Sequence, residues 1–277
     1  MGLLDAVGGL AQGIVDAFLQ TGSGMVIGFV EPMLEVAKVL MTANIDPFSL
    51  IDYWIVMVTV ISAFYVIAFL LVGYKFLFGA YDAVQRAEAK EWAKNAVLIV
   101  ITVNASLLLY SLMLNISSGI ASFLWSADFE SLFIVDSLST LDFIWLNFFT
   151  IAVALAVITL VIRHIVIIFG VMIFPVALFM NFIGPLKPYG SALINLLGGA
   201  AFMNILDIII LIAIQLFWIQ FNYLDIMNIL APTIGFLFVA LANILLILFV
   251  IFKALIPASR VVLDILGVKS AFGALVG

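Results

Sequence analysis

The sequence predicts an all-α, polytopic helical membrane protein with about five transmembrane helices and amphipathic interfacial helices at both termini. Its 277 residues are 67% hydrophobic and only 9% charged, against about 45–50% and about 25% in soluble domains. A soluble fold of this size must cover its surface with polar groups, which this composition does not supply. Five apolar stretches are long enough to cross the hydrocarbon core, roughly 30 Å thick, as helices. Soluble enzymes, DNA-reading domains and disordered chains are thereby excluded.

The predicted spans form a transmembrane domain over residues 51–256. They cover residues 51–78, 96–125, 143–183, 192–221 and 229–256. Residues 1–50 are expected to form external amphipathic helices, and residues 257–277 a cytoplasmic amphipathic tail. Within the first segment, Glu31 and Lys38 belong to one polar stripe at helical spacing.

Charged residues between the spans predict the orientation, because Lys and Arg near span ends prefer the cytoplasm. The loop before the second span holds Arg86, Lys90 and Lys94, whereas the next loop holds four acidic residues and no basic one. The first of these loops is therefore predicted inside and the second outside, which places the N-terminus outside. With five crossings, eight of the ten basic residues lie on the cytoplasmic side.

The third apolar stretch, residues 143–183, is too long for one straight crossing. If it crosses once, the C-terminal basic residues lie inside. If it crosses twice around a turn at Arg163–His164, they lie outside. The charge distribution favours five crossings and a cytoplasmic C-terminus, with six crossings as the alternative. The surplus length is expected to be a tilted helix, a cytoplasmic extension or a break near Pro175.

Ionisable side chains at bilayer depth are costly and mark candidate functional positions. Asp207 lies near the middle of the fourth span, with Asn204 three residues earlier, and Arg163 and His164 lie deep in the third stretch. Two interpretations are open for them. Arg163 and Asp207 pair and lock two helices together, or they line a hydrated conduit. His164 is expected at a helix interface rather than in a proton relay.

The only strongly charged run precedes the second span. Arg86, Lys90 and Lys94 follow one another at intervals of four residues, so a helix would place them along one basic edge. This edge either fixes topology and anchors lipid headgroups, or it docks a cytoplasmic partner or a passing nucleic acid. Three basic residues are too few to establish DNA binding.

Enzymatic chemistry has no positive signal in the sequence. The chain has no cysteine and one histidine, which excludes Cys-ligated metals and leaves little scope for a His-based metal site. It contains no nucleophile–base set, nucleotide-binding loop or metal-ligand cluster. We therefore expect no enzyme, no cofactor and no bound metal.

Two stretches of the chain resemble a known family. The first comprises Phe29-Val-Glu-Pro-Met, Tyr53-Trp54, Gly73-Tyr-Lys-Phe-Leu and the basic helix that leads into Asn95-Ala-Val-Leu-Ile-Val-Ile. The second is Val161-Ile-Arg-His-Ile-Val-Ile-Ile-Phe-Gly-Val-Met-Ile-Phe-Pro-Val-Ala, followed by Lys187-Pro-Tyr. Together they resemble the polytopic inner-membrane channel subunit of type IV secretion and conjugation machines. They look closest to its compact archaeal counterparts in DNA-exchange (Ced-type) systems.

The resemblance implies a homo-oligomeric plasma-membrane subunit that passes DNA without sequence specificity, in conjugation or DNA import. It also implies a pilin-like membrane subunit and a cytoplasmic ATPase as partners. The short central external loop departs from many bacterial members, which puts partner contacts through a larger loop in doubt. Two other hypotheses are a small-solute or ion transporter with Asp207 as its coupling carboxylate, and a passive membrane scaffold.

Overall fold

The protein is a multi-pass helical membrane protein, as the sequence predicts. Its structure, a computed structural model, describes residues 28–78, 83–125, 140–183, 186–220 and 227–265 together with Thr21 and Gly24. Across these residues the regular structure is helical throughout and contains no strand. Five of the helices are long and apolar enough to cross a membrane. Helices suit this role because they satisfy every backbone polar group within the segment, where lipid offers no partner.

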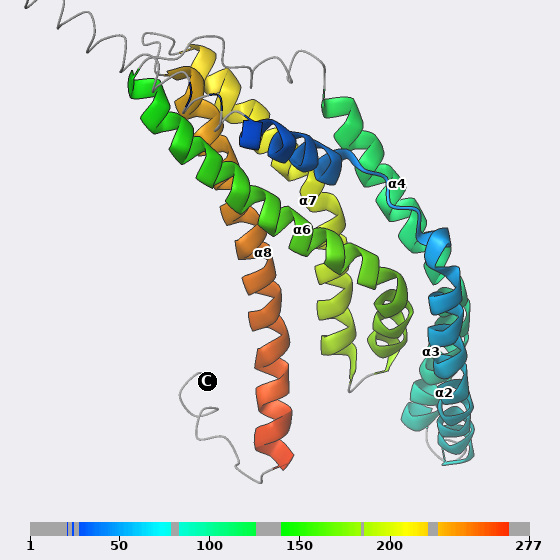
Figure 1. The fold of residues 1–277 in the computed structure, drawn as a ribbon. Coiled ribbons are helices and arrows are strands. Elements are labelled where there is room, and N and C mark those ends of the chain that lie inside the picture. Colours follow the sequence, from blue (N-terminus) through cyan, green and yellow to red (C-terminus); the bar gives the residue numbers. More distant parts are fainter. Residues whose placement is uncertain are drawn as a thin grey trace, which may run out of the picture. The chain divides into compact units, whose positions relative to one another are not determined.

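Figure 1 shows the order of the helices along the chain. In chain order they are residues 28–42 and then η1 (Pro47–Leu50), α2 (Ile51–Phe78), α3 (Ala83–Asn104), α4 (Ser106–Leu124), α6 (Thr140–Phe182), α7 (Lys187–Gln220) and α8 (Met227–Ile265). The 3-10 turn η1 is capped by Asp46, whose side chain accepts a hydrogen bond of 3.0 Å from the Phe48 amide. The expected helix within residues 1–20 lies outside the described residues.

The predicted second span, residues 96–125, falls on two helices. The charged segment and the apolar segment form two successive helices, α3 and α4, which are separated at Ala105. The membrane-spanning candidate is Ser106–Leu124 alone. The Ala105 amide donates to the Ile101 carbonyl and the Leu109 amide to the Ala105 carbonyl, both at 3.0 Å, so α4 follows directly from α3.

The long third stretch forms one helix. Helix α6 has 43 residues and passes through Arg163 and His164 without a turn, with Pro175 inside it. The alternative of six crossings around a turn at Arg163–His164 is therefore wrong. At 1.5 Å per residue α6 is about 65 Å long, roughly twice the hydrocarbon thickness. A helix of this length must tilt or extend beyond the bilayer.

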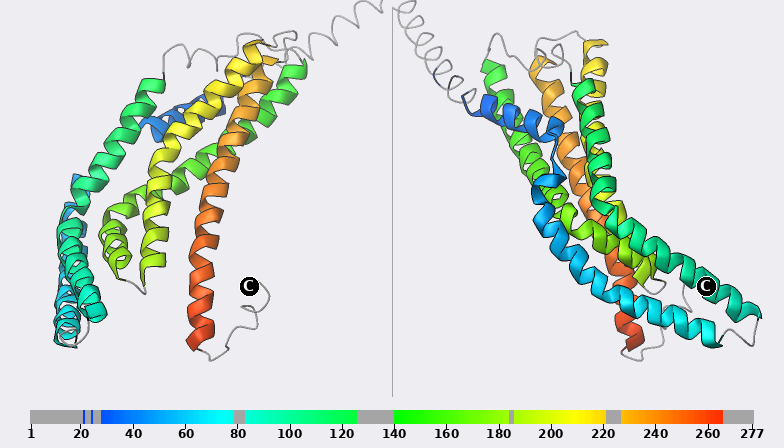
Figure 2. Two further views of the ribbon diagram at one scale, coloured as in Figure 1. Left: turned by 180° about the vertical axis from the view of Figure 1, so that it is seen from behind. Right: turned by 90° about the vertical axis from the view of Figure 1, so that its right-hand side faces the viewer.

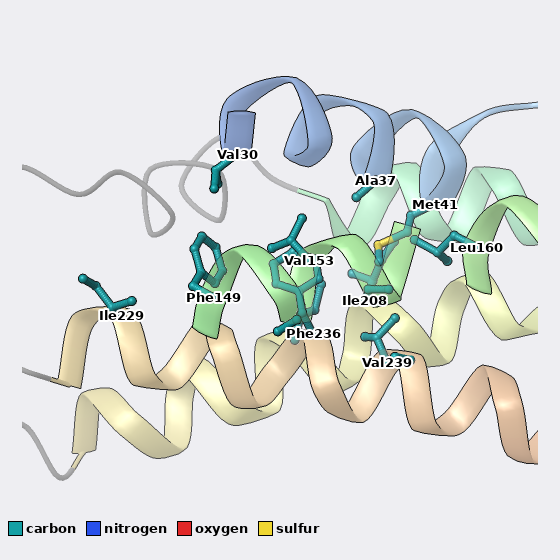
Figure 3. Close-up of a cluster of buried hydrophobic side chains, with 14 of the residues drawn as sticks. Val30, Ala37, Met41, Phe149, Val153, Leu160, Ile208, Ile229, Phe236 and Val239 are labelled. Atoms are coloured by element: carbon teal, nitrogen blue, oxygen red, sulfur yellow. The ribbon is translucent and has the colours of Figure 1, made fainter. Parts of the chain in front are cut away.

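The chain divides into two compact units, which are described separately. The first unit comprises Met1–Ala43, Ser117–His164 and Met203–Ile244. In its core, Val30, Ala37 and Met41 of the N-terminal helix contact apolar side chains of α6, α7 and α8 (Figure 3). The predicted polar stripe lies on the other side of this helix, where Glu31 and Glu35 are exposed. The side of the helix that carries Val30, Ala37 and Met41 is therefore buried against protein.

The second unit comprises Asn44–Ile116, Ile165–Phe202 and Leu245–Gly277. Within it α2 and α3 lie side by side (Figure 2). Two polar side chains connect neighbouring helices: Trp54 Nε1 donates to Ser106 Oγ at 2.8 Å, and Tyr110 Oη donates to the Ile167 carbonyl at 2.8 Å. These bonds fix how α4 sits against α2 and against the second half of α6.

Replacing Tyr110 with phenylalanine is expected to lower the free energy of unfolding by about 1 kcal/mol. The change removes the bond to the Ile167 carbonyl while it preserves the buried ring, and a net hydrogen bond contributes about this much. Thermal unfolding of the purified protein in detergent measures the difference. Tyr53→Phe is the matched control, because Tyr53 is 59% exposed on α2. Equal unfolding temperatures for the two variants would contradict the role of the bond.

Candidate functional site

A buried polar network lies in the first unit at the meeting of three helices. We define the polar network as Arg163 of α6, Asn204 and Asp207 of α7, and Asn243 of α8. Each of these side chains is at most 7% exposed, and Asp207 is fully buried. Asn204 and Asp207 are three residues apart, so the helix places them on the same face of α7. Charged side chains are almost never buried to this extent unless they are paired.

Charge-assisted hydrogen bonds connect all four members. Arg163 Nη1 donates to Asp207 Oδ2 and Arg163 Nη2 donates to Asn204 Oδ1. Arg163 Nη1 also donates to Asn243 Oδ1 at 2.9 Å. Asn243 Nδ2 in turn donates to Asp207 Oδ1 at 2.9 Å. Both carboxylate oxygens of Asp207 are therefore engaged.

The network balances its charge internally, because one guanidinium faces one carboxylate. A buried ion pair is tolerable only when further hydrogen bonds satisfy its remaining donors and acceptors. The two asparagines supply these bonds. Among the described residues, Arg163 Nε is the one fully buried side-chain nitrogen or oxygen of the network without a hydrogen-bond partner. Asn243 is further fixed by a bond of 2.9 Å from Nδ2 to the Val239 carbonyl of its own helix.

This geometry corresponds to the pairing interpretation of Arg163 and Asp207. The sequence also left open that Arg163 and Asp207 line a hydrated conduit. It did not show whether the two side chains lie at the same depth in the membrane. In the structure they contact each other and are buried in the packed unit. The arrangement links α6, α7 and α8, which is one helix more than the pair alone would join. Its hydrogen bonds hold these three helices together, and we call this role a helix lock.

His164 follows Arg163 on α6 but stands apart from the polar network. Its side chain is half-buried and makes no hydrogen bond with the described residues. That His164 is an interface residue rather than a proton relay stays a prediction.

The basic edge lies in the second unit. We define it as Arg86, Lys90 and Lys94, all of which are exposed along α3. Lys75 at the end of α2 is a fourth basic residue of this hairpin, but its Nζ lies 3.1 Å from Glu88 Oε2 and 4.6 Å from the Trp92 ring centroid. The edge is thus an exposed row of cations on a helix that α2 supports.

The sequence singled out three of the four network residues but did not single out Asn243. It was one of five asparagines in or near the spans, and nothing in its local sequence separates it from the others. The spacing of Asn204 and Asp207 on one helix face gave the only signal for an amide partner. Knowing which asparagine of α8 faces α7 requires the packing of the helices.

Other chemistry finds no support in the part of the chain that the structure describes. No group of three His, Asp or Glu side chains there is placed to hold a metal ion. The chain matches no protein-family model, no curated protein and no solved structure. The two sites, the polar network and the basic edge, therefore have to be interpreted from their own geometry.

Proposed function

We propose that this chain is a membrane-embedded channel or scaffold subunit of a DNA-translocating machine of the type IV secretion or conjugation kind. The observation that carries the proposal is the basic edge, an exposed row of three cations at the end of an apolar helical hairpin. Cations in such a row contact phosphates without reading sequence. The family resemblance of the surrounding residues supports the same function.

The proposal extends to orientation and partners. The N-terminus lies outside and the C-terminus in the cytoplasm, so the basic edge faces the cytoplasm. Copies of the chain assemble in the plasma membrane with a pilin-like subunit. A cytoplasmic ATPase supplies the energy, since the sequence contains no nucleotide-binding loop.

The polar network favours a second candidate function, that of a passive membrane scaffold. A network whose carboxylate accepts hydrogen bonds at both oxygens holds helices in place and has no site for a solute. The same feature disfavours a transporter that uses Asp207 as its coupling carboxylate, because coupling requires that carboxylate to exchange partners.

Neutralising the basic edge tests the proposed function. In cells that carry the whole machine, Arg86→Gln, Lys90→Gln and Lys94→Gln together are expected to reduce DNA transfer roughly tenfold or more, because three phosphate contacts disappear. Lys75→Gln is the matched control, since it removes a basic residue of the same hairpin that is already held by Glu88. A reporter at the C-terminus checks that topology is unchanged.

Two results separate the candidates. Unchanged DNA transfer by a correctly inserted triple variant would remove the basic edge from the mechanism and leave the passive scaffold. Co-purification from native membranes is the second measurement. Recovery of a pilin-like protein and an ATPase supports the translocation machine, whereas a chain that transports solute alone in liposomes contradicts it.

A further inference from the structure

The two helices of the α2–α3 hairpin differ in character near their connection. We define the hairpin end as residues 67–78 of α2 and 84–94 of α3, all within the second unit. On α2 its exposed side chains are apolar or aromatic, and Leu70 and Leu77 are 67% and 74% exposed. On α3 its exposed charged side chains are Arg86, Glu88, Lys90, Glu91 and Lys94. We propose that the hairpin end lies along the membrane surface, with α2 among the acyl chains and α3 in the headgroup layer.

Two contacts fix the register of the antiparallel pair. Trp54 Nε1 donates to Ser106 Oγ at 2.8 Å, just after the end of α3. Nearer the connection, Lys75 Nζ donates to Glu88 Oε2 at 3.1 Å. Lys94 lies six residues beyond Glu88, so it is level with a position about six residues before Lys75 on α2. The basic edge therefore lies beside exposed apolar side chains of α2 and not beyond the end of that helix.

The outward face of α3 changes from charged to apolar after Lys94. Lys90 and Lys94 are exposed on this face. At helical spacing Val97 and Ile101 follow them, and both are exposed as well. Because charged side chains avoid hydrocarbon, the hydrocarbon begins at about Val97 on α3. On α2 the exposed apolar surface continues past this level through residues 67–78, a further 18 Å or so along the helix.

An upright hairpin suits only one of its two helices. If the hydrocarbon ends level with Lys94, the last part of α2 stands in water with a contiguous apolar surface, which soluble surfaces rarely carry. If it ends level with Phe78, the cations of α3 lie in hydrocarbon, which is costly. The 28 residues of α2 measure about 42 Å, against a hydrocarbon thickness of roughly 30 Å. A hairpin end parallel to the membrane surface places each helix in the surroundings that its side chains favour.

Lipid is the occupant that the rest of α2 indicates for this apolar surface. The surface continues that of the candidate span, where Val60 and Phe64 are exposed, without a charged residue between them and the hairpin end. The exposed Tyr74 has the amphipathic ring that is enriched at membrane interfaces. The cations of α3 are attracted to the phosphates of the headgroup layer. Apolar continuity and charge therefore both favour a lipid surface.

Lys75 holds the two helices of the hairpin end together. Its Nζ pairs with Glu88 and lies 4.6 Å from the Trp92 ring centroid. Figure 2 shows α2 and α3 side by side along this stretch. The hairpin end therefore meets the membrane surface as one piece. The basic edge stays within reach of water in this arrangement, so the inference goes beyond the proposed function and does not depend on it.

The absence of cysteine from the chain permits a direct test on the full-length protein. Leu70→Cys and Leu77→Cys carry nitroxide spin labels on α2, in vesicles of phosphatidylcholine and phosphatidylglycerol. Gln85→Cys and Glu91→Cys are the matched controls, since both positions are exposed on α3 within the hairpin end. Collisions of each label with oxygen, which enters hydrocarbon, and with a polar nickel complex, which stays in water, are measured by electron paramagnetic resonance.

The ratio of oxygen to nickel collisions is expected to be at least about ten times higher at the two α2 labels than at the α3 controls, because the polar complex does not enter hydrocarbon. The ratios at Leu70 and Leu77 are expected to agree within about twofold, since an upright helix would separate the two in depth by about 10 Å. A ratio at Leu77 as low as at Gln85 would overturn the inference in favour of an upright hairpin. Few collisions with both reagents at the two α2 labels would overturn it in favour of a protein partner. Leu71→Cys and Phe78→Cys, an exposed pair with the same spacing, repeat the measurement if a first variant does not fold.

Discussion

Replacing Asp207 with alanine is expected to lower the free energy of unfolding by about 3–5 kcal/mol, because it leaves the Arg163 guanidinium buried without its counter-charge. Arg163 is 2% exposed, and among the described residues Asp207 is the one carboxylate that it contacts. The two asparagines continue to accept hydrogen bonds but carry no charge. Unfolding of the purified protein in detergent, followed as loss of helix, measures the change.

The double variant Arg163→Met/Asp207→Leu makes the prediction specific. Removal of both charges together is expected to recover most of the loss, since apolar side chains of similar volume often replace a buried ion pair at little cost. Asp52→Ala is the control for loss of a carboxylate. Asp52 is exposed in the first turn of α2, where its charge contributes less than about 1 kcal/mol. A stable Asp207→Ala variant would contradict the role of the polar network as a helix lock.

Replacing Gly190 with alanine is the second change with a large expected effect. A Cβ atom at Gly190 would lie 2.3 Å from the Asn181 amide nitrogen and 2.7 Å from the Ala177 carbonyl oxygen. Both atoms belong to the backbone of α6, so no side chain can move aside. The start of α7 must separate from the end of α6, and overpacking of this kind costs about 1–3 kcal/mol or more.

Gly198 provides the matched control eight residues further along α7. A Cβ atom there would meet only the Met113 sulfur, at 3.9 Å, which is ordinary van der Waals contact. Gly198→Ala is expected to be neutral or slightly stabilising, because alanine favours helix over glycine by up to about 1 kcal/mol. Thermal unfolding of the two variants side by side tests the contact. Equal effects would show that α6 and α7 do not approach closely at Gly190.

Much of the fold follows from apolar length alone. The bounds of α2 coincide with the predicted span 51–78, since a long apolar run with charges only near its ends has only one stable form in lipid. The start of α7 and the end of α8 were less predictable from the sequence. Helix α7 begins at Lys187 rather than 192, and α8 continues through Pro257 to Ile265. Charged or proline residues end a span but need not end a helix.

The faces of these helices were not predictable from the sequence. In a soluble protein the apolar side of a helix identifies its buried side, but a helix surrounded by lipid is apolar on every side. Asparagines in spans usually bond across helices, whereas the Asn104 amide bonds to its own helix. Asn243 looked no different in the sequence, yet it joins the polar network.

Under the proposed function, the ion pair between Lys75 and Glu88 limits how tightly the α2–α3 hairpin holds a nucleic acid. Because Lys75 is engaged, the basic edge presents at most three cations, and each phosphate contact releases about one condensed counterion. Between 50 and 200 mM salt the affinity for a strand would fall only about twentyfold to fortyfold. Under the proposed function, binding of the strand at the basic edge is therefore weak, which favours its release. Tighter electrostatic binding at the basic edge would slow the release of the nucleic acid.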